Sequence, residues 1–169
     1  MSDARYLEIG TWKGSSICSA MCNNKITCTA IDNWSEFGGP KEEFLLNFNK
    51  FKGNNKAVFI VKNCWDIDPK TLGKFNIYMY DGNHTETSHY QTLNHYLPSL
   101  DDQFIFLVDD WNDSSIRNST IKSIQDNQLK TLYEKEIFTP NNSNKNDWHN
   151  GICILYLRND FSSIDIISD

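Results

Sequence analysis

The sequence has no long hydrophobic run. None of its apolar segments approaches the roughly 20 residues of a membrane-spanning helix, and its N-terminus has no hydrophobic signal segment. These absences predict a protein that uses no membrane and works in the cytoplasm. The 169 residues, 39% hydrophobic and 22% charged, have the size and composition of a single globular domain over 1–169.

Positive charge is scarce as well. The chain has 16 Lys and Arg residues against 22 Asp and Glu residues, a formal net charge of −6, and no basic cluster. Since nucleic-acid affinity depends mainly on basic surface, we expect no nucleic-acid partner. The five cysteines are odd in number and form no C-x-x-C pair, so reduced thiols are favoured over disulfides or a zinc site.

Short apolar runs alternate with segments of helical periodicity along the chain. Such alternation predicts a parallel α/β sheet with right-handed crossovers. The last two strands are joined by a polar loop too short for a helical crossover, so they should form an antiparallel hairpin. The tail, 158–169, is expected to be an edge strand or disordered. Strands are expected at 6–9, 25–31, 57–61, 76–80, 103–108, 131–138 and 151–157.

The stretch from Tyr6 to Ser16 has the pattern of a strand, a turn and the start of a helix, with Gly10 and Gly14 in the turn. Many nucleotide-binding units begin this way, although an ordinary corner of an α/β protein has the same pattern. A dinucleotide fingerprint would need a glycine where Trp12 stands, and an indole there would block a pyrophosphate. An NAD-dependent oxidoreductase is therefore disfavoured.

Polar residues follow several expected strands: Asp32, Asn63, Asp81 and the pair Asp109 and Asp110. In open α/β sheets ligands bind beyond the carboxyl ends of the strands, where these side chains should gather. Asp32 follows the second strand, roughly twenty residues after the glycine turn, and an acid there can accept both hydroxyls of a ribose. It can equally be a solvated turn residue, because Asp favours turns.

Three carboxylates, Asp81, Asp109 and Asp110, should converge at this edge of the sheet. They would repel one another unless a cation lies among them, and oxygen ligands suit Mg²⁺ or Ca²⁺. Such an ion could orient a vicinal diol and lower the pKa of one hydroxyl. The candidate catalytic residues are Asp81 and His84, with His84 as general base. Alternatively, Asp109 only caps a helix and His84 is an ordinary surface histidine.

Taken together, E-I-G-T-W-K-G-S-S, A-I-D-N-W, Y-D-G-N-H-T-E and V-D-D-W-N resemble the motifs of class I S-adenosylmethionine-dependent methyltransferases, in the group of small O-methyltransferases with D-G-x-H and D-D. The resemblance runs from about Tyr6 to Leu157. It implies a three-layer Rossmann-like sandwich whose mostly parallel seven-stranded sheet has the order 3-2-1-4-5-7-6 and ends in an antiparallel hairpin.

The resemblance also implies roles for individual residues. Glu8, Gly10 and Gly14 would line the methionine part of S-adenosylmethionine, and Asp32 would bind its ribose. Asn63 stands where the family often has an Asp that contacts adenine; an amide can donate a hydrogen bond where a carboxylate only accepts. The acceptor or a metal ion would face the remaining acids, Asp81, Asp109 and Asp110.

The expected function is methylation of a hydroxyl on a small molecule such as a sugar, with S-adenosylmethionine as cofactor and Mg²⁺ or Ca²⁺ as an optional one. No D/N-P-P-Y/F follows the fourth strand, which disfavours methylation of amino groups on nucleic-acid bases. The chain begins almost at the first strand, whereas the family usually has helices there. The expectations left open are an open pocket completed by a homo-oligomer, and an inactive module that binds cofactor or a partner without turnover.

Overall fold

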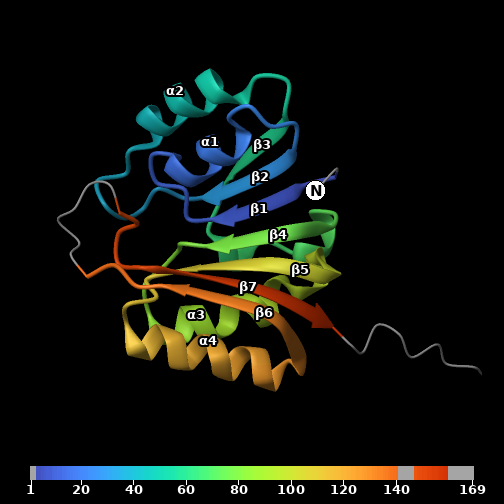
Figure 1. The fold of residues 1–169 in the computed structure, drawn as a ribbon. Helices are drawn as coiled ribbons and strands as arrows, with labels where there is room; N and C mark the ends of the chain where they lie inside the picture. The colour runs from blue at the N-terminus through green and yellow to red at the C-terminus, as the bar shows by residue number, and fades with distance from the viewer. Residues whose placement is uncertain (1–2, 141–146, 160–169) are drawn as a thin grey trace, which may run out of the picture.

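A computed structural model of the chain describes residues 3–140 and 147–159. Its strands form one seven-stranded sheet in the order β3-β2-β1-β4-β5-β7-β6, the order expected from the sequence (Figure 1). Three short 3₁₀ turns lie at Cys64–Asp66, Pro69–Thr71 and Leu97–Ser99. The other elements are β1 (Arg5–Ile9), α1 (Ser15–Met21), β2 (Thr27–Asp32), α2 (Lys41–Lys52), β3 (Lys56–Val61), β4 (Phe75–Tyr80), α3 (Glu86–Tyr96), β5 (Leu100–Asp109), α4 (Ser114–Asp126), β6 (Leu129–Ile137) and β7 (Ile152–Asn159).

The sheet is parallel except at one edge. β1 to β5 pair in parallel, whereas β7 runs antiparallel to both β5 and β6, so the predicted C-terminal hairpin is confirmed. The expected boundary at residue 158 is wrong. Arg158 and Asn159 still belong to β7, because they are paired with Gln103 of β5 and Leu129 of β6. The rest of the predicted tail, 160–169, lies outside the described residues.

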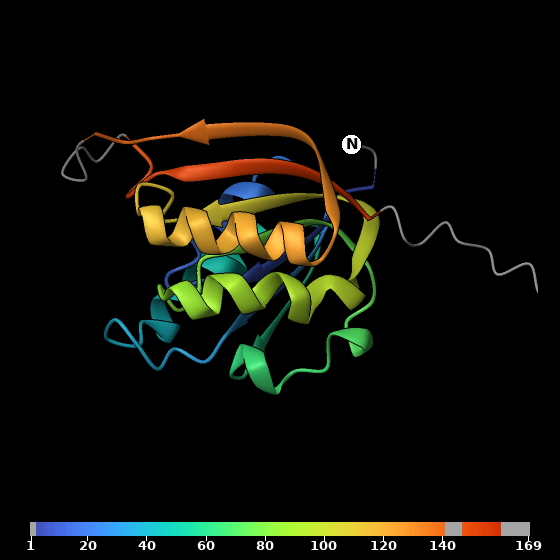
Figure 2. The ribbon, with the colours of Figure 1, turned by 90° about the horizontal axis from the view of Figure 1, so that it is seen from below.

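Helices cover both faces of the sheet and make the three layers of the predicted fold. Alternate residues of a strand point to opposite faces. Leu7 of β1 accordingly belongs to a core shared with α3 and α4, and Tyr6 to a second core that includes Ile17 of α1 and Phe44 of α2. Figure 2 shows α3 and α4 side by side under the sheet. The two cores fix the strands, and therefore the positions of the loops that follow them.

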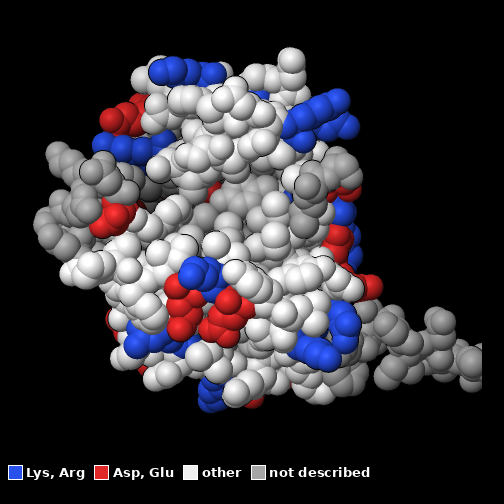
Figure 3. Space-filling view, in the orientation of Figure 1, with Lys and Arg blue, Asp and Glu red and all other residues white. Residues whose placement is uncertain are grey.

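The surface agrees with the composition. On the face drawn in Figure 3, basic and acidic side chains are interspersed, and Lys and Arg do not gather into one patch. Within residues 3–140 and 147–159, no helix has both the length and the apolar character to cross a membrane.

The turns after β1 and β4 touch each other through their backbones. Gly10, with φ of 80°, lies so close to the turn after β4 that a Cβ atom on it would be 1.8 Å from the carbonyl oxygen of Asp81. The family resemblance implies that Gly10 lines the methionine part of the cofactor. The structure adds a packing role, because any side chain there would push apart the two loops that carry the predicted site.

We predict that Gly10→Ala lowers the melting temperature by at least about twice as much as Gly38→Ala. Gly38 has nearly the same φ, 79°, but a Cβ on it would meet nothing within 4 Å. The control therefore measures only the strain of a positive φ, about 1–3 kcal/mol, whereas Gly10→Ala adds the clash with Asp81. Differential scanning calorimetry of both variants is the measurement. Equal losses would show that the contact with Asp81 relaxes without cost.

Candidate active site

A cleft of about 1010 Å³ lies at the carboxyl ends of β1, β2, β3, β4 and β5. In Figure 1 the arrowheads of β1, β2 and β4 point toward this edge of the sheet. Neither Glu8 nor Gly14 is part of the lining. The other seven predicted site residues all line the cleft: Gly10, Asp32, Asn63, Asp81, His84, Asp109 and Asp110.

Asp32 ends β2, and its carboxylate organises the glycine turn. Oδ2 accepts hydrogen bonds from the backbone N–H groups of Thr11 (2.8 Å) and Trp12 (2.9 Å), and Oδ1 accepts one from Trp34 N–H (2.7 Å). Because a carboxylate oxygen has about two acceptor positions, Oδ2 is saturated and Oδ1 has one position left. The acceptor position open to a ribose hydroxyl is therefore at Oδ1, and the contact of Asp32 with both ribose hydroxyls stays a prediction.

Glu8 lies inside the protein, with 0% of its surface exposed. Its carboxylate accepts hydrogen bonds from the Tyr6 hydroxyl, from Ser16 Oγ (2.8 Å) and from the backbone of Ile17. Burial raises the pKa of Glu8 to about 7, although these hydrogen bonds act in the opposite direction. The expectation that Glu8 itself lines the cofactor pocket is therefore wrong. It is enclosed behind Ser16, which does line the cleft and which Glu8 holds at the start of α1.

Gly14 and Asn63 have clear local roles. Gly14 precedes α1 with φ of 84°, and a Cβ on it would lie 3.1 Å from the ring of Phe44, so its small size serves the packing of α1 on α2 rather than the lining of the cleft. Asn63 follows β3, and its Oδ1 accepts a hydrogen bond from the backbone N–H of Trp65 (3.1 Å). With Oδ1 engaged, the amide NH₂ of Asn63 is the group available to donate to a ligand.

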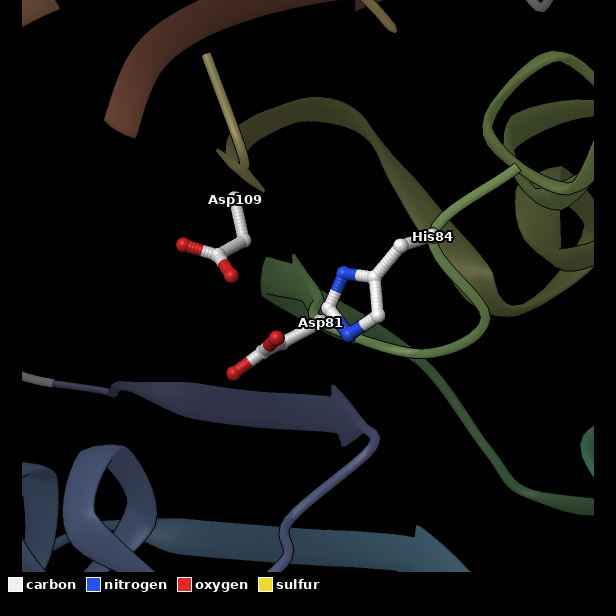
Figure 4. A group of neighbouring side chains, drawn as sticks. All are labelled: Asp81, His84 and Asp109. Atoms are coloured by element: carbon white, nitrogen blue, oxygen red, sulfur yellow. The ribbon is translucent and has the colours of Figure 1, made fainter. Parts of the chain in front are cut away.

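Asp81 directly follows β4 and Asp109 ends the neighbouring strand β5, and their carboxyl groups face each other (Figure 4). One potential ligand atom from each of Asp81, His84 and Asp109 lies within 4.8 Å of the other two. Burial raises the pKa of Asp81 well above its usual range, and the charge and hydrogen bond of Asp109 raise it further. Two carboxyl groups this close disfavour each other's ionised form unless a cation lies between them.

Asp110 is directed away from this pair and toward His84. Its backbone is left-handed, with φ of 58°, so the two successive acids serve different partners. The carboxylate of Asp110 accepts hydrogen bonds from His84 Nδ1 and from Asn150 Nδ2 (2.7 Å). Burial opposes ionisation of Asp110, but these hydrogen bonds hold its pKa below the usual range. The hydrogen bond from His84 also raises the pKa of the imidazole, against the effect of burial.

The predicted metal set is thus rearranged. Of the three acids proposed from the sequence, Asp81 and Asp109 come together, while Asp110 supports His84 instead. His84 takes the third position of the cluster. Because the Asp110 carboxylate accepts the proton on Nδ1, the other ring nitrogen, Nε2, is the one that can act as a base or bind a metal ion.

The loop before β7 contributes residues that sequence reasoning missed. Trp148 Nε1 donates a hydrogen bond to Asp109 Oδ1 (2.5 Å), and Asn150 donates to Asp110. A backbone hydrogen bond from Asn112 N–H to the Asn150 carbonyl (2.8 Å) holds this loop against the end of β5. The only signal in the sequence was indirect: this loop enters the strand that pairs with β5.

Three exposed aromatic side chains also line the cleft and were not assigned from the sequence. Trp12, Phe37 and Trp148 have 50%, 67% and 38% of their surface exposed. Phe37 lies edge-on to the His84 ring, with 5.6 Å between ring centroids, and its carbonyl accepts a hydrogen bond from Trp12 Nε1 (3.3 Å). The loop after β2 therefore reaches across to the residues that follow β4.

A sequence model of the family described as "Methyltransferase domain" matches residues 7–111, more than half of the chain. No curated protein matches the sequence of this chain. Solved structures with a similar fold include cofactor-bound Rv0187 from MTB, at 14% identity and a TM-score of 0.62, covering 89% of this chain and 71% of that one. The O-methyltransferase TomG from Streptomyces achromogenes, involved in tomaymycin synthesis and in complex with SAM, has 13% identity, a TM-score of 0.62, and coverage of 91% and 73%. An O-methyltransferase from Bacillus cereus in complex with SAH has 8% identity, a TM-score of 0.62, and coverage of 91% and 74%.

The buried Glu8 should make the stability of the protein depend on pH. Its pKa is about 7 in the folded state and 4.5 ordinarily. Below 4.5 both states hold the proton; between 4.5 and 7 only the folded state does, so this contribution to stability falls as pH rises and is lost above about 7. At about 1.4 kcal/mol per pH unit, the full effect is about 3 kcal/mol.

We therefore expect the melting temperature of the wild type to fall between about pH 5 and about pH 8, and to fall much less in Glu8→Gln. The amide keeps the size and the acceptor oxygen but does not titrate. Glu86→Gln, which neutralises an exposed acid of α3, is the control and should follow the wild type. If Glu8→Gln and the wild type showed the same pH dependence, the buried carboxyl would not be protonated near neutral pH.

Proposed function

Because the chain belongs to the methyltransferase domain family, we propose that it is an S-adenosylmethionine-dependent methyltransferase that methylates a hydroxyl of a small molecule such as a sugar. One observation carries the proposal. A single cleft holds the loop of Gly10 and Asp32 on one side and the pair of His84 and Asp110 on the other. A cofactor and an acceptor bound in these two parts would lie side by side.

The residues toward β2 and β3 form the cofactor part of the cleft in this proposal. The free position on Asp32 Oδ1 accepts one ribose hydroxyl, and the NH₂ of Asn63 donates to the adenine ring, whose nitrogens are acceptors. Gly10 leaves the backbone of the turn open to the methionine part, and Ser16, held by Glu8, lies next to it. When bound, S-adenosylmethionine supplies a methyl group on a positively charged sulfur.

The residues toward β4 and β5 act on the acceptor. His84 Nε2 takes the proton of the acceptor hydroxyl, and Asp110 fixes the ring through Nδ1 and stabilises the imidazolium that forms. Trp148 restrains Asp109 at one oxygen, which leaves the other oxygen for a ligand. Catalysis then depends mainly on orientation of the hydroxyl and on this proton transfer.

The pair Asp81 and Asp109 fits a divalent cation. Burial and the charge of Asp109 disfavour the ionised form of Asp81, a cation between the two carboxyl groups would offset this repulsion, and oxygen ligands suit Mg²⁺ or Ca²⁺. When bound, such an ion supplies a positive charge that favours the ionised form of a nearby hydroxyl. We propose that His84 is the base rather than a third metal ligand. We also propose that the protein is cytoplasmic, that it has no membrane or nucleic-acid partner, and that a homo-oligomer completes the pocket.

The cofactor assignment is tested by isothermal titration calorimetry with S-adenosylhomocysteine and its 2′-deoxy and 3′-deoxy analogues. We expect micromolar binding to the wild type and roughly tenfold weaker binding to Asp32→Asn, because a charge-assisted hydrogen bond is lost. If Asp32 binds a ribose hydroxyl, the deoxy analogue that lacks this hydroxyl should bind to Asp32→Asn nearly as tightly as S-adenosylhomocysteine does, because the variant has already lost the contact. Additive losses for both analogues would mean that Asp32 acts only by holding the turn, and no binding to the wild type would contradict the proposed function.

The metal assignment is tested by melting curves with Mg²⁺ and with Ca²⁺. An ion at a hundredfold excess over its Kd stabilises the folded wild type by about 2.7 kcal/mol. Asp81→Asn should lose most of this shift, and without metal it should be neutral or stabilising, since it removes carboxylate repulsion. His84→Ala should keep the shift if His84 is the base. Asp113→Asn, which changes an exposed acid at the start of α4, is the control. If neither Mg²⁺ nor Ca²⁺ changed the melting temperature of the wild type, the proposed metal site would be contradicted.

A further inference from the structure

The two parts of the cleft differ in charge. Among its described lining residues, Lys62 is the only lysine or arginine, and it follows β3 in the cofactor part. Two histidines, His84 and His149, are the other groups that can be positive. Besides Asp32 in the cofactor part, five carboxyl groups line the cleft: Asp81, Asp109, Asp110 and Asp147 in the acceptor part, and Glu36 on the loop after β2, which reaches across to it. Such a lining repels phosphorylated or carboxylated acceptors and attracts cationic ones.

Glu36 shows that the negative charge of this part of the cleft does not depend on Asp81 and Asp109 alone. It lies on the exposed loop after β2, and its Oε1 accepts a hydrogen bond from Asn83 Nδ2 (3.5 Å) across the cleft. It is therefore outside the carboxyl pair of Asp81 and Asp109, whose charge a divalent cation would offset. A negative charge remains beside His84 whether or not such an ion is bound.

The aromatic side chains give an independent indication. Five large aromatic residues of the described chain are exposed, and three of them, Trp12, Phe37 and Trp148, line this one cleft. Exposed aromatic groups gathered at a concave site are typical of ligand binding. Aromatic faces next to carboxylates favour one kind of ligand in particular, an organic ammonium ion, because the ring face is the negative end of its quadrupole.

One of these rings, Trp12, already has Lys13 Nζ 4.8 Å from its centroid. We infer that the acceptor carries a protonated amine beside its hydroxyl groups: it is a hydroxylated organic ammonium compound, with the ammonium held by Glu36, Phe37 and Trp148 and a hydroxyl presented to His84. This inference rests on the proposed function and specifies its substrate class. In the reaction the bond from methyl carbon to sulfur breaks as the bond to the hydroxyl oxygen forms. The hydroxyl proton passes to His84, S-adenosylhomocysteine leaves, and the ammonium group is unchanged.

Two sources of this chemistry, amino sugars and hydroxylated aromatic amines, are separated by two matched series of ligands. One series is glucosamine, glucose and glucuronate; the other is dopamine, catechol and 3,4-dihydroxybenzoate. Within each series the hydroxyl-bearing ring is similar and the charge runs from positive through neutral to negative. Binding is measured by calorimetry on protein saturated with S-adenosylhomocysteine, with and without Mg²⁺.

In at least one series we expect the cation to bind at least about tenfold more tightly than the neutral ligand, a difference in the range of a desolvated cation–π contact with a neighbouring charge. The anion should bind most weakly, and added salt should reduce the advantage of the cation. Neutral or anionic ligands that bind as tightly as the cation in both series, or no binding of either cation, would overturn the inference while the cofactor titration still supported the proposed function. Failure of S-adenosylhomocysteine to bind would overturn both.

Two variants locate the recognition. Glu36→Gln should weaken binding of the cation by about threefold or more and leave the neutral ligand and S-adenosylhomocysteine unchanged. Glu42→Gln removes the same charge from an exposed position on α2 that does not line the cleft, and should change nothing. Phe37→Leu keeps an apolar side chain but removes the ring face, and should also weaken the cation selectively. Equal affinities in all these proteins would show that the ammonium is not recognised at this loop.

Discussion

The arrangement of the cleft depends on the backbone contact between Gly10 and the carbonyl of Asp81. The hydrogen-bond ladder places β1 beside β4, but side chains at the start of the two following turns would normally hold those turns apart. A glycine at this point lets the turn after β1 rest directly on the turn after β4. The part of the cleft organised by Asp32 and the part that contains Asp81 and His84 therefore lie next to each other, as transfer between two bound molecules requires.

The pKa values of the acidic residues around this contact are set in three different ways. Glu8 is enclosed and keeps its proton up to about pH 7 because burial outweighs its hydrogen bonds. Asp81 shares a buried position with Asp109, and its pKa is raised by burial and by that neighbour. Asp110 is ionised because His84 and Asn150 donate to it. The pKa shifts of these acids thus differ in direction, upward for Glu8 and Asp81 and downward for Asp110, and Asp110 is the one that accepts a hydrogen bond from His84.

Much of the fold and part of the site could be predicted from the sequence. The strand order was implied by the resemblance to class I methyltransferases, and Asp32, Asp81 and Asp109 line one cleft as expected because parallel strands bring their carboxyl ends to one edge. The direction of each side chain could not be predicted. The left-handed backbone of Asp110 directs its side chain away from the pair of Asp81 and Asp109. The side chain of Glu8 is buried because it points into the core on the α1 side of β1. Trp148 reaches Asp109 only through tertiary packing of a loop.

The negative acceptor part of the cleft is compatible with the proposed transfer because the reaction moves positive charge without creating or removing any. The cofactor enters with a positive sulfur, and after transfer the positive charge is on the proton held by His84, within the same field of carboxylates. The field therefore favours binding of the charged cofactor over its neutral product without opposing the chemical step. A positively lined cleft would have the opposite effect: it would bind the product better than the cofactor. The acidic lining from which we infer an ammonium acceptor would thus also favour release of S-adenosylhomocysteine.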